Sequence, residues 1–320
     1  MKQLDNTLIK ILDKAIENID YKRVIGAIVF GSYVKGRIDE LSDIDIAVIT
    51  NDTGEVHKYF QYNGIDIDLL LIPKKFFEEV LEEVDNRSNY TLWLTHTLYL
   101  KILKEGMIIH DTLNTLNTWI EYMGKWKWTK RDLEQAINHL YIILDKALEL
   151  FDENMFFEAF LALRDSINQL PIIYELKNNV IPSPKAKDIY LAAGKYRLIN
   201  KYIEIHGLKN IDNSLIKQVM GKASIVDNIY IRRNIKKIMR ELIRGNNQVA
   251  LLEARNLYLS IIDPKHRSFE RLDSIFNKIS FIQEIPIEER CFIEKLYGID
   301  YMDNTKFREY IDYILKKIPR

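Results

Sequence analysis

Four acidic residues lie in two closely spaced pairs, each within a short apolar stretch. Asp43-Ile44-Asp45 begins one stretch, and Ile65-Asp66-Ile67-Asp68 begins another. Because side chains alternate between the two faces of a strand, the aspartates of each pair would point to the same side. Carboxylates held side by side repel each other unless a cation lies between them, and oxygen ligands suit Mg²⁺ or Mn²⁺. The spacing therefore predicts a divalent metal site that uses Asp43, Asp45 and one acid of the second pair.

The turn before the first acidic stretch offers contacts for phosphate. Gly31-Ser32 ends an apolar run, and Gly36 follows in the same turn. Glycine allows close backbone approach, and this turn supplies N–H groups and the Ser32 hydroxyl to phosphate oxygens. An Asp-x-Asp motif alone is a weak signal, because glycosyltransferases use one to bind a metal and a sugar nucleotide. Its combination with Gly31-Ser32 and a later acidic strand favours phosphoryl or nucleotidyl transfer.

The apolar pattern predicts the elements that position these residues. It indicates a helix over 3–20, strands over 23–30, 42–49, 56–62 and 65–72, and a turn with a short helix over 31–41. Asn63-Gly64 predicts a tight hairpin turn. Helices over 74–84 and 89–103 and a strand over 107–111 follow, and the later pattern is helical. The predicted fold class is α+β, with a nucleotide-transferring mixed-sheet domain (1–112), a helical bundle (113–260) and a helical C-terminal extension (261–320).

The composition of the 320 residues limits the class of protein. Lysine plus arginine and aspartate plus glutamate both number 46, so the overall charge does not favour binding to nucleic acid or an anionic membrane. The single cysteine, Cys291, excludes a disulfide framework and fits a reducing cytoplasm. The six histidines show no metal-ligand spacing. We expect a soluble cytoplasmic protein without a membrane span.

Two groups of motifs resemble known nucleotidyltransferases. The order Gly-Ser, short turn, Asp-x-Asp and later acid resembles the polymerase-β-like nucleotidyltransferase superfamily. The stretch Glu121-Tyr122-Met123-Gly124-Lys125-Trp126 resembles the E-Y-x-G-K-W segment of kanamycin (aminoglycoside 4′-) nucleotidyltransferases, with weaker similarity at Leu94-Thr95-His96 and 108–111. The resemblance covers about residues 20–126. This chain differs in having Asp45 and Asp68 where those enzymes have glutamates, and its later helical part is not recognisable.

The resemblance implies a role for each matching residue. It implies Asp43, Asp45 and Asp68 as ligands of two Mg²⁺ ions, with Asp68 preferred to Asp66 as the third ligand. Glu121 would be the general base for the acceptor hydroxyl. The expected contacts to the phosphates of an NTP, with ATP as the expected co-substrate, are Gly31, Ser32, Lys35, Ser42 and Lys125. A homodimer is implied as well, with Glu121 and Lys125 facing the metal site of the other subunit.

The predicted reaction is transfer of a nucleoside monophosphate to a hydroxyl of a small molecule, with an aminoglycoside-like antibiotic as the candidate acceptor. A second hypothesis has RNA or protein as the acceptor, as in toxin–antitoxin nucleotidyltransferases. Its support is a basic stripe over residues 230–244, formed by Arg232, Lys236, Arg240 and Arg244, although such a stripe is more often a solvated face. A third hypothesis is a nucleotide-binding regulator without catalytic activity.

Overall fold

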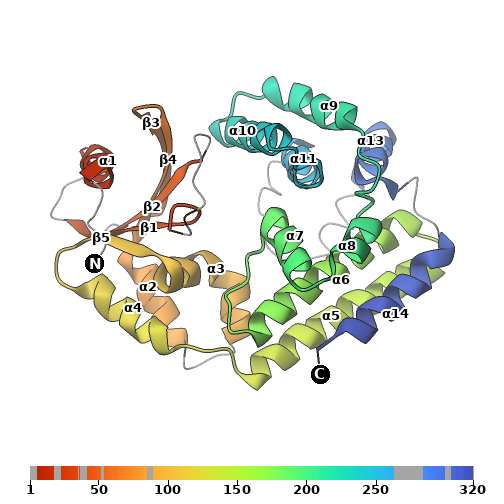
Figure 1. Cartoon of the computed structure of the whole chain (residues 1–320), viewed down its shortest axis with the longest axis horizontal. Helices are drawn as coiled ribbons and strands as arrows, with labels where there is room; N and C mark the ends of the chain where they lie inside the picture. Colours follow the sequence, from red (N-terminus) through yellow and green to blue (C-terminus); the bar gives the residue numbers. More distant parts are fainter. Residues whose placement is uncertain are drawn as a thin grey trace. The chain divides into compact units, whose positions relative to one another are not determined.

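The computed structural model describes residues 6–17, 23–34, 36, 42–51, 54–84, 89–262, 284–299 and 304–319. Contacts divide the chain into two compact units, Met1–Lys127 and Trp128–Arg320 (Figure 1). The first unit contains α1 (Asn6–Ile16), β1 (Val24–Phe30), β2 (Ile44–Thr50), β3 (Val56–Tyr62), β4 (Ile65–Pro73), α2 (Lys74–Glu83), α3 (Asn89–Glu105), β5 (Met107–Asp111) and α4 (Thr115–Lys125). This division places α4 in the sheet unit, whereas the domain boundary predicted from the sequence falls before it. The predicted short helix within 31–41 falls mostly outside the described residues.

In the described part of the chain, five strands form one mixed sheet in the order β3-β4-β2-β1-β5. The central β2 pairs in parallel with β4, while the pairs β1–β2, β1–β5 and β3–β4 are antiparallel. One sheet face, which includes Ile44, Ile46, Ile67 and Leu69, packs in a buried core with α1. The other face packs against α2, α3 and α4 (Figure 1). The strand alternation therefore points Asp45 and Asp68 to the side of α2–α4, away from the α1 core.

The second unit is helical in its described residues. It contains α5 (Lys130–Asp152), α6 (Phe156–Lys177), α7 (Ala186–Lys195), α8 (Ile199–Ile205), α9 (Asn213–Ser224), α10 (Ile229–Ile243), α11 (Asn247–Ile262), α13 (Ile287–Tyr297) and α14 (Phe307–Lys317). The long helices α5 and α6 pack along each other, and α14 packs on α6, where Phe307 meets Phe160 edge-on. Phe307 also stacks on Phe151 of α5. The α+β prediction, a mixed sheet followed by helices, is confirmed. None of the described helices has the length and apolar character needed to cross a bilayer.

Two buried arginines join the C-terminal ends of two helices in this unit. Arg255 of α11 donates to the carbonyls of His206, Leu296 and Tyr297, and Arg164 of α6 donates to the carbonyl of Ile205, all at 2.9–3.0 Å. These carbonyls end α8 and α13, where unpaired C=O groups carry partial negative charge. Burial lowers the pKa of Arg255 to about 10, which leaves it protonated at neutral pH. The two cations therefore satisfy helix ends that would otherwise be buried without partners.

Gly207 and Gly298 continue the chain beyond these two helix ends. Both have positive φ, at 62° and 64°, and their backbones lie against each other. A Cβ atom on Gly207 would lie 3.2 Å from the carbonyl oxygens of Tyr297 and Gly298, closer than side chains normally approach. Glycine is therefore required at Gly207 both by the left-handed conformation and by the close approach of the second helix end.

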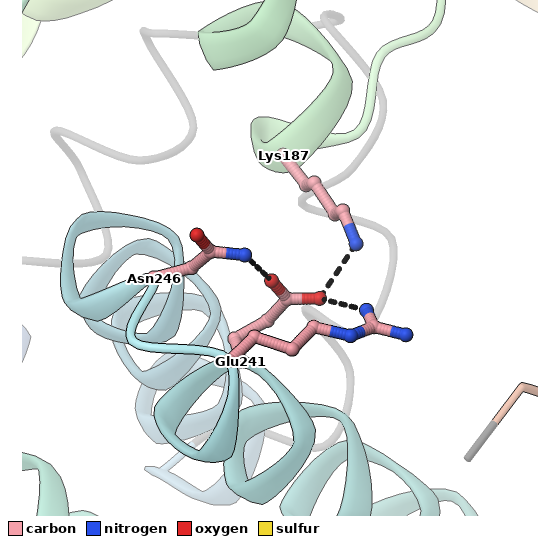
Figure 2. Close-up of polar contacts among 4 residues, drawn as sticks. Lys187, Glu241 and Asn246 are labelled. Carbon is pink, nitrogen blue, oxygen red and sulfur yellow. Dashed lines mark hydrogen bonds and ion pairs between the residues drawn. The ribbon is translucent and has the colours of Figure 1, made fainter. Parts of the chain in front are cut away.

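A buried glutamate connects α7 to the turn between α10 and α11. Glu241 is 3% exposed, and its Oε1 accepts hydrogen bonds from Lys187 at 2.6 Å and Arg244 at 2.9 Å (Figure 2). Its Oε2 accepts from the amide of Asn246 at 2.8 Å. Burial acts to raise the pKa of Glu241, but the bonds from Lys187 and Asn246 and the charges of Lys187 and Arg244 outweigh it and lower that pKa below its ordinary 4.5. Glu241 is therefore ionised at neutral pH.

We expect Glu241→Gln to lower the free energy of unfolding at neutral pH by about 2 kcal/mol, because charge-assisted hydrogen bonds to a buried carboxylate are lost. Since folding lowers the pKa of Glu241, its stabilisation is present above the unfolded pKa and is lost as the pH falls through the folded pKa. The difference between the two proteins should therefore narrow below pH 4.5. Urea unfolding, followed by far-ultraviolet circular dichroism at several pH values, measures it.

The matched control is Glu149→Gln, which removes an exposed pair with Lys146 in the same unit. Such a pair contributes less than about 1 kcal/mol. Equal effects of the two substitutions, or an effect of Glu241→Gln that does not change with pH, would contradict the assigned role of Glu241.

Candidate active site

Three carboxylates lie close together at the start of β2 and at the neighbouring position of β4. Asp43 immediately precedes β2, and Asp45 is directly opposite Asp68 in the parallel pairing of β2 with β4. Each residue offers one carboxylate oxygen, and these oxygens all lie within 4.8 Å of one another. Asp43 is 8% exposed and Asp68 is 5% exposed, so water screens their charges poorly. The site thus concentrates negative charge where little solvent reaches it.

Gly31 lies against this cluster. It follows β1, whose last residue Phe30 is paired with Asp45. Its φ of 75° is in the left-handed region, and a Cβ atom at this position would collide with Oδ2 of Asp45. A residue without a side chain is therefore required here for two reasons, the backbone conformation and the space occupied by the carboxylate. The predicted phosphate turn therefore begins directly beside Asp45, one of the predicted metal ligands.

The other acid of β4, Asp66, makes a different contact from Asp68. Asp66 accepts a hydrogen bond of 2.7 Å from the amide of Gln61 on β3, and it is not a member of the carboxylate cluster. The sequence preference for Asp68 over Asp66 thus agrees with the geometry, while the role of Asp68 as a metal ligand stays a prediction.

The sequence analysis missed a histidine at this site. Oδ1 of Asp68 is in hydrogen-bond contact with Nε2 of His57, a residue of β3. A histidine in an edge strand has no recognisable metal-ligand spacing. The hairpin turn Asn63-Gly64 was the available signal, because it fixes the register that places His57 diagonally across from Asp68.

The remaining predicted residues are placed at different parts of the first unit. Ser42 is buried beside Asp43, and Ser32 follows Gly31 in the turn. Lys35 lies outside the described residues. Glu121 and Lys125 are exposed on α4, which packs on α3, β1 and β5. The sheet order places β1 between β5 and the strand of Asp45, so Glu121 and Lys125 belong to the β5 side of the sheet.

The donor set of the cluster fits a hard divalent cation. It consists of three carboxylates, two of them two residues apart in sequence and the third on the neighbouring strand, and carboxylate oxygens are the ligands that Mg²⁺ and Mn²⁺ prefer. A cation would also remove the repulsion between the three charges, which burial makes stronger. Asp43, Asp45 and Asp68 are therefore suited to hold Mg²⁺ or Mn²⁺.

One comparison, with protein-family models, agrees with this geometry. Residues 10–113 match the family described as "Polymerase beta, Nucleotidyltransferase", and this segment includes β1–β5 and the three aspartates. The first unit thus contains a polymerase-β-like nucleotidyltransferase domain. Among solved structures, a nucleotidyltransferase-like protein from Exiguobacterium sibiricum matches with a TM-score of 0.36 and 13% identity, over 96% of this chain and 91% of that chain. A search of curated proteins found no match.

We expect Gly31→Ala to weaken Mn²⁺ binding by about tenfold or more, because the added methyl group displaces the Asp45 carboxylate from the cluster. Titration with Mn²⁺, followed by electron paramagnetic resonance of the free ion, measures the affinity. Gly36→Ala is the matched control, since Gly36 has a similar positive φ of 64° but no atom within 4 Å of the added Cβ. If both variants bind Mn²⁺ equally well, contact with Asp45 is not the reason for glycine at position 31.

Proposed function

We propose that this protein is a nucleotidyltransferase that moves a nucleoside monophosphate from an NTP to a hydroxyl of a small molecule, with release of pyrophosphate. The observation that carries the proposal is the cluster of Asp43, Asp45 and Asp68, whose oxygens lie within 4.8 Å of one another in a polymerase-β-like domain. Cytoplasmic location remains part of the proposal and rests on the single cysteine.

In the proposed site the three aspartates hold two Mg²⁺ ions, and the turn after β1 binds the triphosphate of ATP or another NTP. The bound cations would neutralise phosphate charge and favour attack at the α-phosphorus. Backbone N–H groups of Gly31 and Ser32, with the hydroxyls of Ser32 and Ser42, would contact phosphate oxygens. The contact between Gly31 and Asp45 supports this arrangement, because it places the turn directly beside the acids.

The proposed general base is Glu121, and Lys125 is the proposed additional phosphate contact. Glu121 takes the proton of the acceptor hydroxyl as its oxygen bonds to the α-phosphorus, and the bond from that phosphorus to pyrophosphate breaks. Glu and Lys four residues apart share a helix face, and both are exposed on α4. The resemblance to kanamycin nucleotidyltransferases adds to this proposal a homodimer in which Glu121 and Lys125 act on the metal site of the partner.

The acceptor we propose is a hydroxyl-bearing small molecule of the aminoglycoside kind. For RNA, the support was the basic stripe over residues 230–244, and Arg232 and Arg244 of this stripe are already in ion pairs. Arg232 binds Asp227, and Arg244 binds the buried Glu241. These pairs reduce the charge that the stripe offers to phosphates, so the small-molecule acceptor is preferred.

The reaction is tested by measuring pyrophosphate release from Mg-ATP and Mg-GTP with kanamycin, neomycin and a panel of other hydroxylated small molecules. We expect release that depends on an aminoglycoside and is lost in Asp43→Ala. Pyrophosphate release that does not depend on any compound of the panel would support a nucleotidyltransferase whose acceptor is RNA or protein. Tight Mg-NTP binding without release under any condition would favour a regulator and contradict the proposed enzyme.

Sharing of the site between subunits is tested by mixing two inactive variants. Asp43→Ala and Glu121→Gln should each lose turnover, and Glu121→Gln should still bind NTP because it keeps the phosphate contacts. After subunit exchange at equal amounts, mixed dimers contain one site with both residues intact, which predicts recovery of about a quarter of the activity. Absence of recovery in exchanged mixtures, or an active monomer by sedimentation, would place Glu121 in the site of its own subunit or outside it.

A further inference from the structure

The edge strand β3 contributes a side chain to the carboxylate cluster. Tyr59 is directly opposite Asp68, and His57 is opposite Leu70, two residues farther along β4. Residues two apart on a strand share a face, so His57 is a diagonal neighbour of Asp68. Nε2 of His57 contacts Oδ1 of Asp68, and the two side chains are 25% and 7% exposed. The contact therefore lies at the margin between the buried acids and solvent.

Metal binding by Asp68 would set the direction of this hydrogen bond. A carboxylate that holds a cation is ionised and has no hydrogen to donate, so the N–H at Nε2 of His57 would be the donor and Oδ1 of Asp68 the acceptor. A donor on one oxygen restrains rotation of the carboxylate about its bond to Cβ. It also attracts the negative charge of Asp68 towards Oδ1, which reduces the repulsion between Asp68 and the carboxylates of Asp43 and Asp45.

The backbone that carries His57 is held by a short hairpin. Asn63 and Gly64 have φ values of 50° and 81°, and positive φ at both central positions is the signature of the two-residue turn that matches strand twist. Every residue of β3 from Val56 to Tyr62 is in register with β4. The donor is thus carried on a strand whose register relative to Asp68 is fixed by the turn.

We propose that His57 is a positioning residue for the metal site, holding the Asp68 carboxylate in the orientation in which it joins Asp43 and Asp45. The inference rests on the proposed function in that the cluster must bind a divalent cation. His57 itself is outside the group of metal-ligand atoms found among the described residues, so it acts through Asp68. Partners of this kind typically change metal affinity by about 10–100-fold when they are removed.

The test is Mn²⁺ affinity, measured by electron paramagnetic resonance on the full-length protein and its variants. We expect His57→Ala to bind Mn²⁺ about 10–100-fold more weakly, since it loses the donor. His57→Gln, whose side-chain N–H₂ keeps a donor at a similar reach, should recover most of the affinity. Excess Mn²⁺ should restore pyrophosphate release by His57→Ala, which a variant with a damaged fold would not do.

Two controls separate positioning from a general effect on the sheet. His110 lies on β5 at the opposite edge, where it contacts the Thr112 hydroxyl at 3.0 Å, and His110→Ala should leave Mn²⁺ affinity unchanged. If His57→Ala does not fold, His57→Leu replaces it, because leucine keeps the bulk without a donor. Melting temperatures without metal show whether a variant only weakens the β3–β4 hairpin.

The outcomes distinguish this inference from the proposed function. If Asp68→Asn binds Mn²⁺ as tightly as the unaltered protein, the cluster is not the metal site and both proposals fail. If Asp68→Asn loses affinity but His57→Ala does not, the metal site stands and the positioning role of His57 is wrong. If His57→Gln is as weak as His57→Ala, the hydrogen bond is not the cause. Loss in His57→Ala with recovery in His57→Gln supports the role.

Discussion

The register between β2 and β4 is the constraint on which the candidate site depends. It sets Asp45 opposite Asp68, and the residues on either side of them, Ile44, Ile46, Ile67 and Leu69, are buried on the opposite face against α1. A shift by one residue would turn the acids into the α1 core and move these apolar side chains to the other face, so the core fixes the register. The price of that arrangement is mutual repulsion of poorly screened carboxylates. Gly31 leaves room for the Asp45 carboxylate, and His57 contacts the Asp68 carboxylate.

The helical unit also depends on buried charge, and its buried charges are compensated by neighbouring residues. Glu241 is surrounded by Lys187, Arg244 and Asn246, and Arg255 is surrounded by three helix-terminal carbonyls. Buried ion pairs of this kind specify geometry more than they add stability. The first unit differs in that Asp43, Asp45 and Asp68 bring carboxylate oxygens together within 4.8 Å of one another, a donor set that suits a divalent cation.

Much of the sheet and its acids could be predicted from the sequence. The strands containing Asp45 and Asp68 begin with alternating apolar and acidic residues and continue as apolar runs, and Asn63-Gly64 is a hairpin turn, so these elements agree with the structure. The preference for Asp68 came from the family resemblance, since alternation places Asp66 and Asp68 on the same face. The prediction assumed that the strands of Asp45 and Asp68 pair with each other, because no local sequence pattern indicates which strands become neighbours. The contact of Gly31 with Asp45 depends on strand pairing that spacing alone does not reveal.

The helical region could be predicted only as helices. Arg255 reaches carbonyls of residues that are more than forty positions away in sequence, and periodicity holds no information about such partners. The close approach of the helix ends at Gly207 and Gly298 predicts the effect of a truncating mutation. A stop codon near position 260 would appear to remove a dispensable tail, yet it would delete two of the three carbonyls that Arg255 binds and the Phe307 ring that stacks on Phe151. Such an allele would leave the buried Arg255 cation with one of its three acceptors, so its product would be lost through misfolding of the helical unit.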